Sequence, residues 1–504
     1  MKKYLIITWI LAFSFAGIHA QMATGDSLAL VAFYDSTNGP NWTNNSNWLQ
    51  PGQPVSTWYG ISTNTSSDHV VLIQLAGNNL TGHLPAVMFD LPELELLYLY
   101  RNEISGTIPE EIGSLGNLKY LILESNHLTG EIPPQLGMLA NLLTLDLIKN
   151  DLTGPIPVSL CNLVNLQGMD LGNNHLSGNI PSQIDNLTNL TYLYLQDNDL
   201  YDPIPPEIGN LTNLSVLALD SNHLSGPIPA QIGNLANLTD LALEHNEFIG
   251  SIPNDICNLT YLITLYMGYN NLSGPLPSGL ISMPSLNNLK VQMNYFTFSD
   301  LESLLGNTFP YFEYSPQRQI PISPLDTTVT SGDNLTLDIS DLAISDITAT
   351  NNQYQWGKDG SFITSPGTSP ILNLDDFEYS SQGYYYCCIT NSDFPLLSLS
   401  TDSIFVSVKT RPNDITIYDT RIDENDILEG LKIYPNPTHD YVIFDFPEEV
   451  PGFSFELYNT IGTMLEKQEN CAGKIIHLQN YPSGLYILKV QYNSYQIIKK
   501  LKKI

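Results

Sequence analysis

An asparagine recurs every 24 residues through nearly half of this 504-residue chain. Around each one the frame Leu-x-Leu-x-x-Asn-x-Leu is usually followed by Ser/Thr-Gly-x-Ile-Pro, as in LDLIKNDLTGPIP from Leu145 to Pro157. So strict a period without insertions predicts a solenoid, because one repeat is too small to bury its own leucines and neighbours must stack. The ten recurring residues are Asn78, Asn102, Asn126, Asn150, Asn174, Asn198, Asn222, Asn246, Asn270 and Asn294.

Each of these asparagines stands where the chain is expected to leave a strand and turn inward. A side-chain amide can donate to and accept from backbone groups of adjacent turns. We therefore predict a structural asparagine ladder that satisfies buried polar groups along the whole stack.

The repeats resemble leucine-rich repeats of the plant-type 24-residue subclass, in which the Ile-Pro segment leads into Ile-Gly-Asn-Leu. The resemblance implies an α/β solenoid over residues 70–298, with a parallel β-sheet lining one face of an arc and ligands on that face or at an edge. Kinase receptors share the subclass, but no kinase motif and no transmembrane segment are found in this sequence.

Residues 21–69 lack the repeat and contain the helix-like run DSLALVAFYDST, followed by three tryptophans. The end of a solenoid exposes leucines that need a cover, so this segment is predicted to be the N-terminal cap. The segment Trp58-Tyr59-Gly60 resembles the aromatic stretch that often precedes such repeats. Trp42, Trp48 and Trp58 are expected in the core of the cap rather than in a sugar-binding site.

Residues 299–319 are predicted to close the other end of the solenoid. Ser299 followed by Glu302 before an apolar run is typical of a capping box, which indicates a short helix there.

Residues 320–410 contain short alternating apolar segments separated by Gly, Pro, Asn and Asp, the pattern of a small all-β sandwich. The segment resembles an immunoglobulin-like fold, with Trp356 as the core tryptophan and Gly-x-Tyr385-x-Cys387 as the tyrosine-corner segment. The earlier strand offers Leu335 and Leu337 where that family has its other cysteine, so no inter-sheet disulfide is expected. The resemblance implies a spacer or an accessory binding module.

An acidic linker at 411–429 is predicted to lead into a second small all-β sandwich at 430–504. This sandwich resembles the C-terminal sorting domain of the type IX (Por) secretion system of Bacteroidetes-type bacteria through Tyr434-Pro-Asn-Pro437, the segment from Tyr458 to Gly462, Ser483-Gly-Leu-Tyr486 and a lysine-ended final strand. Residues 1–20 have the basic start and apolar run of a secretory signal peptide. The resemblance implies a secreted or outer-surface protein whose export partner is the type IX machinery.

The formal net charge of -32 makes nucleic acid an unlikely partner, because phosphate backbones would be repelled. The five cysteines do not form a disulfide framework: Cys161 and Cys257 are four repeats apart, which is roughly 19 Å at the usual strand spacing. No catalytic motif, phosphate loop or metal-binding motif is present. We therefore predict a non-enzyme that uses no cofactor and no metal.

The positions six, four, two and one before each ladder asparagine are predicted to project from the concave face. Tyrosines there offer contact area with little entropy loss and acids add hydrogen-bond acceptors, which suits a carbohydrate or a cationic peptide. Alternatively, tyrosine stands there simply because it fits a solvent-facing strand. The predicted ligand-binding residues are Tyr98, Tyr100, Arg101, Tyr120, Glu124, Asp146, Asp170, Tyr192, Tyr194, Asp220, Asp240, Glu244, Tyr266 and Tyr269.

A second pattern lies directly after the ladder, where acids and histidines alternate from repeat to repeat. Neighbouring acids favour a protonated imidazole, so the row could respond to mild acid, or a His and a carboxylate could hold a metal. Alternation could equally serve only to keep like charges apart. The row comprises Glu103, His127, Asp151, His175, Asp199, His223 and Glu247.

Together these features predict an extracellular, adhesin-like binding protein that recognises a protein or carbohydrate ligand on its arc without covalent chemistry. An inhibitor of a secreted hydrolase is the alternative, suggested by plant inhibitors built on similar repeats. A polysaccharide-acting enzyme is a weaker alternative.

Overall fold

The computed structural model divides into two compact units, Met1–Arg411 and Pro412–Ile504. The predicted signal peptide and acidic linker lie outside the residues that it describes. The described residues are 24–304, 309–320, 326–340, 351–409, 432–434, 441–445, 453–459, 464–471, 475–477, 481–482, 484–492 and 495–503.

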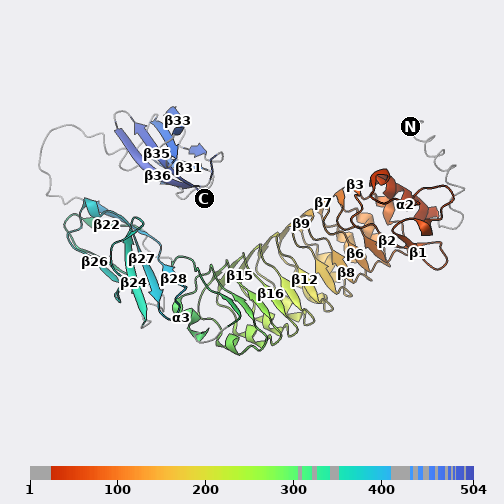
Figure 1. The fold of residues 1–504 in the computed structure, drawn as a ribbon, viewed down its shortest axis with the longest axis horizontal. Coiled ribbons are helices and arrows are strands. Elements are labelled where there is room, and N and C mark those ends of the chain that lie inside the picture. Colours follow the sequence, from red (N-terminus) through yellow and green to blue (C-terminus); the bar gives the residue numbers. More distant parts are fainter. Residues whose placement is uncertain are drawn as a thin grey trace. The chain divides into compact units, whose positions relative to one another are not determined.

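The repeats build a 12-stranded sheet, called here the concave sheet (Figure 1). Its first pair, β1 and β2, is antiparallel, and every later pair is parallel. Leucine pairs with leucine across these strands, as in Leu97, Leu121 and Leu145, because each strand repeats the same pattern. In sheet order the strands are β1 (Ile61–Thr63), β2 (Val70–Gln74), β4 (Leu96–Tyr98), β6 (Tyr120–Ile122), β8 (Thr144–Asp146), β10 (Gly168–Asp170), β12 (Tyr192–Tyr194), β14 (Val216–Ala218), β16 (Asp240–Ala242), β18 (Thr264–Tyr266), β20 (Asn288–Lys290) and β21 (Tyr311–Glu313).

Nine further strands, which come after the ladder asparagines in the sequence, form a second parallel sheet that we call the lateral sheet. This sheet was not predicted from the sequence. Its strands are β3 (Thr81–His83), β5 (Glu103–Gly106), β7 (His127–Glu131), β9 (Asp151–Pro155), β11 (His175–Gly178), β13 (Asp199–Asp202), β15 (His223–Pro227), β17 (Glu247–Gly250) and β19 (Asn271–Leu272).

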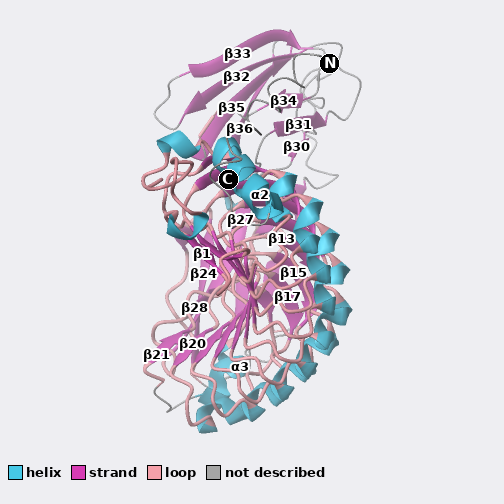
Figure 2. Ribbon diagram, turned by 90° about the vertical axis from the view of Figure 1, so that its right-hand side faces the viewer, coloured by secondary structure: helices cyan, strands magenta, loops and turns pink. Residues whose placement is uncertain are grey.

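Short 3-10 helices complete each turn. Each follows a proline, and the backbone of that proline is extended in every case but Pro277. In Figure 2 these helices run along the outer border of the solenoid, and the strands lie inside it. The helices are η3 (Ala86–Phe89), η4 (Glu110–Ser114), η5 (Pro134–Met138), η6 (Val158–Asn162), η7 (Ser182–Asn186), η8 (Pro206–Asn210), η9 (Ala230–Asn234), η10 (Asn254–Asn258) and η11 (Ser278–Ser282).

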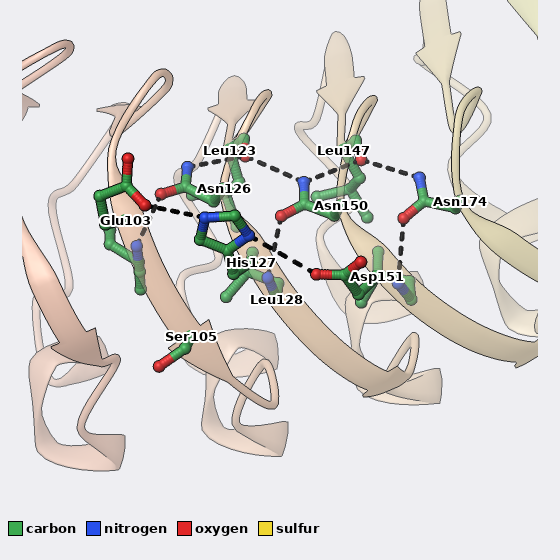
Figure 3. Close-up of polar contacts among 12 residues, drawn as sticks. Glu103, Ser105, Leu123, Asn126, His127, Leu128, Leu147, Asn150, Asp151 and Asn174 are labelled. Carbon is green, nitrogen blue, oxygen red and sulfur yellow. Dashed lines mark hydrogen bonds and ion pairs between the residues drawn. The ribbon is translucent and has the colours of Figure 1, made fainter.

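The ladder asparagines are buried and join successive repeats (Figure 3). The Asn150 side-chain amide donates to the carbonyls of Leu147 at 3.0 Å and Leu123 at 3.1 Å. Its side-chain oxygen accepts from the Leu128 N–H at 3.1 Å. One side chain therefore satisfies three backbone groups drawn from two adjacent repeats.

A second asparagine row, which was not predicted from the sequence, lies on the outside of the turns. Each side-chain amide donates to a carbonyl 25 residues earlier, for example from Asn165 to Ala140 at 2.8 Å. The signal was an Asn-Leu pair with the same 24-residue period. This row comprises Asn117, Asn141, Asn165, Asn189, Asn213 and Asn237.

The N-terminal cap contains helix α2 (Thr24–Ser36) and the short turns η1 (Gly39–Asn41) and η2 (Val55–Thr57). All three tryptophans are buried, and each one contacts the next tryptophan along the chain. Ring centroids are 4.9 Å apart for Trp42 and Trp48, and 4.8 Å apart for Trp48 and Trp58. The expectation that they are core residues is confirmed.

At the other end the predicted capping box was wrong. Helix α3 (Phe298–Leu301) begins after Thr297, whose N–H donates to the Asp300 carboxylate at 3.0 Å, so Thr297 and Asp300 form the box. Ser299 lies inside the helix, and Glu302 begins the following turn η12 (Glu302–Leu304). The prediction named the wrong pair because Thr297 and Asp300 have the same three-residue spacing as Ser299 and Glu302.

Residues after the solenoid form a second β structure within the same unit. The strands β22 (Asp326–Thr330), β29 (Ile404–Lys409), β27 (Gly383–Asn391), β24 (Asn352–Lys358), β25 (Ser361–Phe362) and β28 (Ser398–Ser400) make one sheet, and β23 (Leu335–Asp338) pairs with β26 (Ile371–Leu374). Turn η14 (Tyr379–Ser381) precedes β27. This structure contacts the end of the solenoid, where the rings of Phe298 and Phe394 are 6.0 Å apart.

The second unit has two sheets of its own. One contains β30 (Lys432–Tyr434), β31 (Tyr441–Asp445) and β34 (Ile475–His477). The other contains β33 (Met464–Cys471), β32 (Phe453–Asn459), β35 (Gly484–Tyr492) and β36 (Tyr495–Lys503). Leu457, Leu488 and Val490 are fully buried in this second sheet. No helix among the described residues of the chain is long and apolar enough to span a membrane.

Candidate ligand-binding face

In most of its three-residue strands the concave sheet leaves the two outer side chains partly exposed and buries the one between them; Gly168 and Ala218 are outer residues that are buried. In β12, for example, Tyr192 and Tyr194 are half-buried while Leu193 is fully buried. The predicted residues at strand ends are therefore Tyr98, Tyr120, Asp146, Asp170, Tyr192, Tyr194, Asp240 and Tyr266. The turns directly after the strands carry Tyr100, Arg101, Glu124, Asp220, Glu244 and Tyr269. None of the fourteen is fully buried.

Tyrosines dominate the N-terminal part of this face. The rings of Tyr98 and Tyr120 meet edge to face at 6.4 Å, and burial raises the pKa of the Tyr98 hydroxyl. The Arg101 guanidinium lies 6.0 Å from the centre of the Tyr100 ring and 3.9 Å from the Glu124 carboxylate. This end presents aromatic surface with one exposed cation.

Asp146 and Asp170 form a carboxylate pair at the centre of the face, in register on β8 and β10. The Ile148 N–H donates to Asp146 at 3.2 Å, and the Gly172 N–H donates to Asp170 at 3.1 Å. Burial is the main cause that raises the pKa of Asp146 to about 6 and of Asp170 to about 7. Nearby carboxylates add to both pKa shifts.

Beside this pair, a missing side chain leaves room for an aromatic ring of the neighbouring strand. A Cβ on Gly168 would come within 1.9 Å of the Tyr192 ring, so only glycine is compatible with this ring position. The Tyr192 ring is 5.6 Å from the Tyr194 ring. The two tyrosines therefore cover the sheet next to Asp170.

The C-terminal part of the face mixes charges and rings. Burial raises the pKa of Asp220 to about 6 and also raises that of Glu244. Three further residues on this part of the face were not predicted, although they occupy the same repeat positions as the predicted ones. The Gln292 amide donates to Glu244 at 3.4 Å, the Lys290 ammonium lies 4.5 Å above the Tyr266 ring, and His245 stacks on Tyr269 at 4.1 Å.

The acid and histidine row lies on the lateral sheet, away from the concave strands (Figure 3). His127 Nε2 is 2.8 Å from Glu103, and His127 Nδ1 is 3.7 Å from Asp151. His223 similarly lies 4.0 Å from Asp199 and 3.6 Å from Glu247. Among the described residues, no group of three or more His, Cys, Asp or Glu side chains is placed to hold a metal ion.

Comparison with known families identifies two parts of the chain. The leucine-rich repeat region family matches residues 88–226, and the leucine-rich repeat family matches residues 237–259 and 261–283. The secretion system C-terminal sorting domain matches residues 432–503, which indicates secretion by the type IX system to the cell surface or outside. These matches point to no enzyme family. No curated protein matches the sequence.

Among solved structures, the ectodomain of the plant membrane receptor kinase GASSHO1/SCHENGEN3 from Arabidopsis thaliana, in complex with CASPARIAN STRIP INTEGRITY FACTOR 2, is similar to this chain. It is 34% identical over 60% of this chain and 36% of that chain, with a TM-score of 0.56. The plant peptide hormone receptor RGFR1 in complex with RGF2 is 32% identical over 50% of this chain and 40% of that chain, with a TM-score of 0.46. A plant ice-binding protein is 26% identical over 58% of this chain and 99% of that chain, with a TM-score of 0.49.

This chain therefore spans well under two thirds of the two receptor ectodomains. The repeats have a leucine-rich repeat fold that resembles the fold of a plant receptor ectodomain.

Proposed function

We propose that this protein is an extracellular binding protein that recognises a ligand non-covalently on its concave sheet. The observation that carries the proposal is the concentration of half-buried tyrosines and carboxylates on one rigid, solvent-facing sheet. A solenoid holds such side chains in place without further ordering, so little entropy is lost on binding. In this proposal the fourteen predicted residues form the binding face and the ladder asparagines hold it.

The domain boundaries predicted from the sequence are part of the proposal. We assign residues 320–410 to an immunoglobulin-like sandwich that holds the solenoid away from the cell. Two observations support this assignment: Trp356 pairs with Cys387 across neighbouring strands, and the Tyr385 hydroxyl donates to the Ser381 carbonyl four residues upstream, as in a tyrosine corner. The sorting domain would then deliver the protein to the surface or release it, which fits an adhesin-like role.

The similar Arabidopsis receptor ectodomain supports a protein ligand over a carbohydrate, since its structure contains a bound protein factor. This support covers the repeats alone.

The test is binding of the full chain to an array that carries both glycans and peptides. A variant with Tyr98→Ala, Tyr120→Ala and Tyr192→Ala should lose selective binding, because it removes three aromatic contacts from the concave sheet. A matched variant with Tyr201→Ala and Tyr261→Ala, two exposed tyrosines outside that sheet, should bind like the unmodified chain. Binding that survives the first variant would move the site off the concave sheet. Tight binding to a folded hydrolase with loss of its activity would favour the inhibitor alternative.

A further inference from the structure

We infer that the ligand of the concave sheet is a basic segment of a partner protein, with one lysine or arginine side chain received by Asp146 and Asp170. This inference rests on the proposed function and states the chemistry of its ligand. The neighbouring residues of the segment would pack on the tyrosines that flank the carboxylate pair.

The geometry of the pair fits a cation. Asp146 and Asp170 occupy the same position on adjacent strands, about 4.8 Å apart at the usual strand spacing. One oxygen of each carboxylate accepts a backbone N–H. Neither side chain forms an ion pair with a lysine or arginine among the described residues, and their remaining oxygens have no hydrogen-bond donor there. Two open carboxylate oxygens side by side match the fork of a guanidinium or the donors of an ammonium group.

The fold does not require acids at these two positions. The equivalent strand-end position in other repeats holds Ile122, Ala218 or Ala242, and the leucines that build the core lie on the opposite side of the sheet. Two half-buried like charges that form no ion pair with a lysine or arginine among the described residues are unfavourable for folding, although the charge of Lys149 favours ionised Asp170. A cation supplied by a ligand would offset this unfavourable free energy. The carboxylate pair is therefore well suited to bind a positively charged group of a partner.

Aromatic rings stand on both sides of the pair. Tyr120 precedes it on β6, and Tyr192 and Tyr194 follow it on β12. Between them the strands carry only Thr144 and Gly168 at the matching position, so the acids are not covered by large side chains of their own strands. Such a frame suits the long apolar stem and charged head of lysine or arginine, which also interacts favourably with the ring faces.

The charge of the whole chain favours the same kind of partner. With 51 acidic residues against 19 basic ones, the protein attracts basic segments and repels acidic ones over long range. Glu124, Asp220 and Glu244 extend the negative character along the concave sheet on either side of the pair.

The experiment uses the full chain and an array of short peptides that contain tyrosine, glycine, serine and varied numbers of lysine or arginine. Each peptide has a partner in which every basic residue is replaced by glutamine. Binding is measured for the unmodified chain and for the variant Asp146→Asn/Asp170→Asn. The control variant Asp151→Asn/Asp199→Asn removes the same two charges from the lateral sheet, and thermal melts verify that both variants fold.

We expect basic peptides to bind at least about tenfold more tightly than their glutamine partners, the usual value of a hydrogen bond to a charged group. The variant Asp146→Asn/Asp170→Asn should lose this preference, and the control should keep it. If the preference persists in that variant, or if no basic peptide binds, the inference is overturned.

A further variant separates this inference from the proposed function. If Tyr120→Ala/Tyr192→Ala abolishes binding of any array ligand while Asp146→Asn/Asp170→Asn does not, the concave sheet binds ligand without the carboxylate pair. If neither variant changes binding, the proposed function fails as well.

Discussion

The side-chain oxygen of Gln317 accepts a hydrogen bond from the backbone N–H of Asn294 at 3.0 Å. The Gln317 amide donates to the carbonyls of Val291 at 3.0 Å and Tyr314 at 2.6 Å. Gln317, which lies outside the repeat pattern, therefore makes the same kind of hydrogen bonds as a ladder asparagine and extends the ladder by one residue. Three residues later, the Ile320 N–H donates to the Ser400 carbonyl at 2.8 Å, so the hydrogen bonding continues into the next β structure of the same unit.

Replacing Gln317 with alanine should destabilise this end of the solenoid. The change leaves the buried Asn294 N–H without its partner, and one buried unsatisfied group costs about 1–3 kcal/mol. The Val291 carbonyl loses one hydrogen bond and keeps the one from the Asn294 amide. The denaturant midpoint for unfolding should fall measurably. Gln183→Ala, at an exposed position, should shift the free energy of unfolding by no more than about 0.5 kcal/mol. Equal midpoints for both variants would contradict the role given to Gln317.

The two asparagine rows should differ sharply in their effect on stability. Asn150→Ala removes three hydrogen bonds to buried backbone groups and should lower the free energy of unfolding by about 3 kcal/mol or more. Asn165→Ala removes one hydrogen bond at an exposed site, where water replaces the lost donor, and should cost about 1 kcal/mol or less. Urea unfolding followed by circular dichroism measures both, and similar losses would show that burial does not separate the two rows.

Asp170 should make the protein less stable as the pH rises. Its pKa is about 7 in the folded chain against an ordinary value of 3.8, so the folded state holds the proton more tightly than the unfolded state. Stability is therefore favoured below about pH 4 and is lost progressively as the pH rises through 7. Asp170→Asn should raise the melting temperature at pH 8 and flatten its dependence between pH 5 and 8. Asp35→Asn, an exposed substitution in α2, should leave that dependence unchanged.

The acid and histidine row offers a test of its two interpretations. His127 lies 2.8 Å from Glu103 and 3.7 Å from Asp151, so its ring contacts an acid on each side. The variant His127→Ala/His175→Ala removes these contacts and should lower the free energy of unfolding by less than about 1 kcal/mol for each pair, because all these side chains are more than half exposed. Thermal melts measure the difference, and equal melting temperatures for both chains would mean that the alternation only separates like charges.

The sequence by itself determined the repeat, the stacking of the repeats and the positions within each repeat that lie on the concave sheet or in the turn after it. This was possible because every repeat contacts the same positions of its neighbours. Residues that are 24 positions apart in the sequence are therefore neighbours in the structure. Leu121 pairs with Leu145 for the same reason that both stand in the frame Leu-x-Leu-x-x-Asn.

Features that do not follow the 24-residue period were decided only by the tertiary structure. The capping box at Thr297 and Asp300, the use of Gln317 as a ladder residue and the Tyr192 ring across Gly168 each depend on contacts that no repeated pattern encodes. The raised pKa values of Asp146 and Asp170 likewise required the burial of both side chains in the folded sheet. Periodic positions follow from the sequence because their surroundings repeat, whereas the ends of the solenoid and the chemistry of its surface depend on surroundings that occur once.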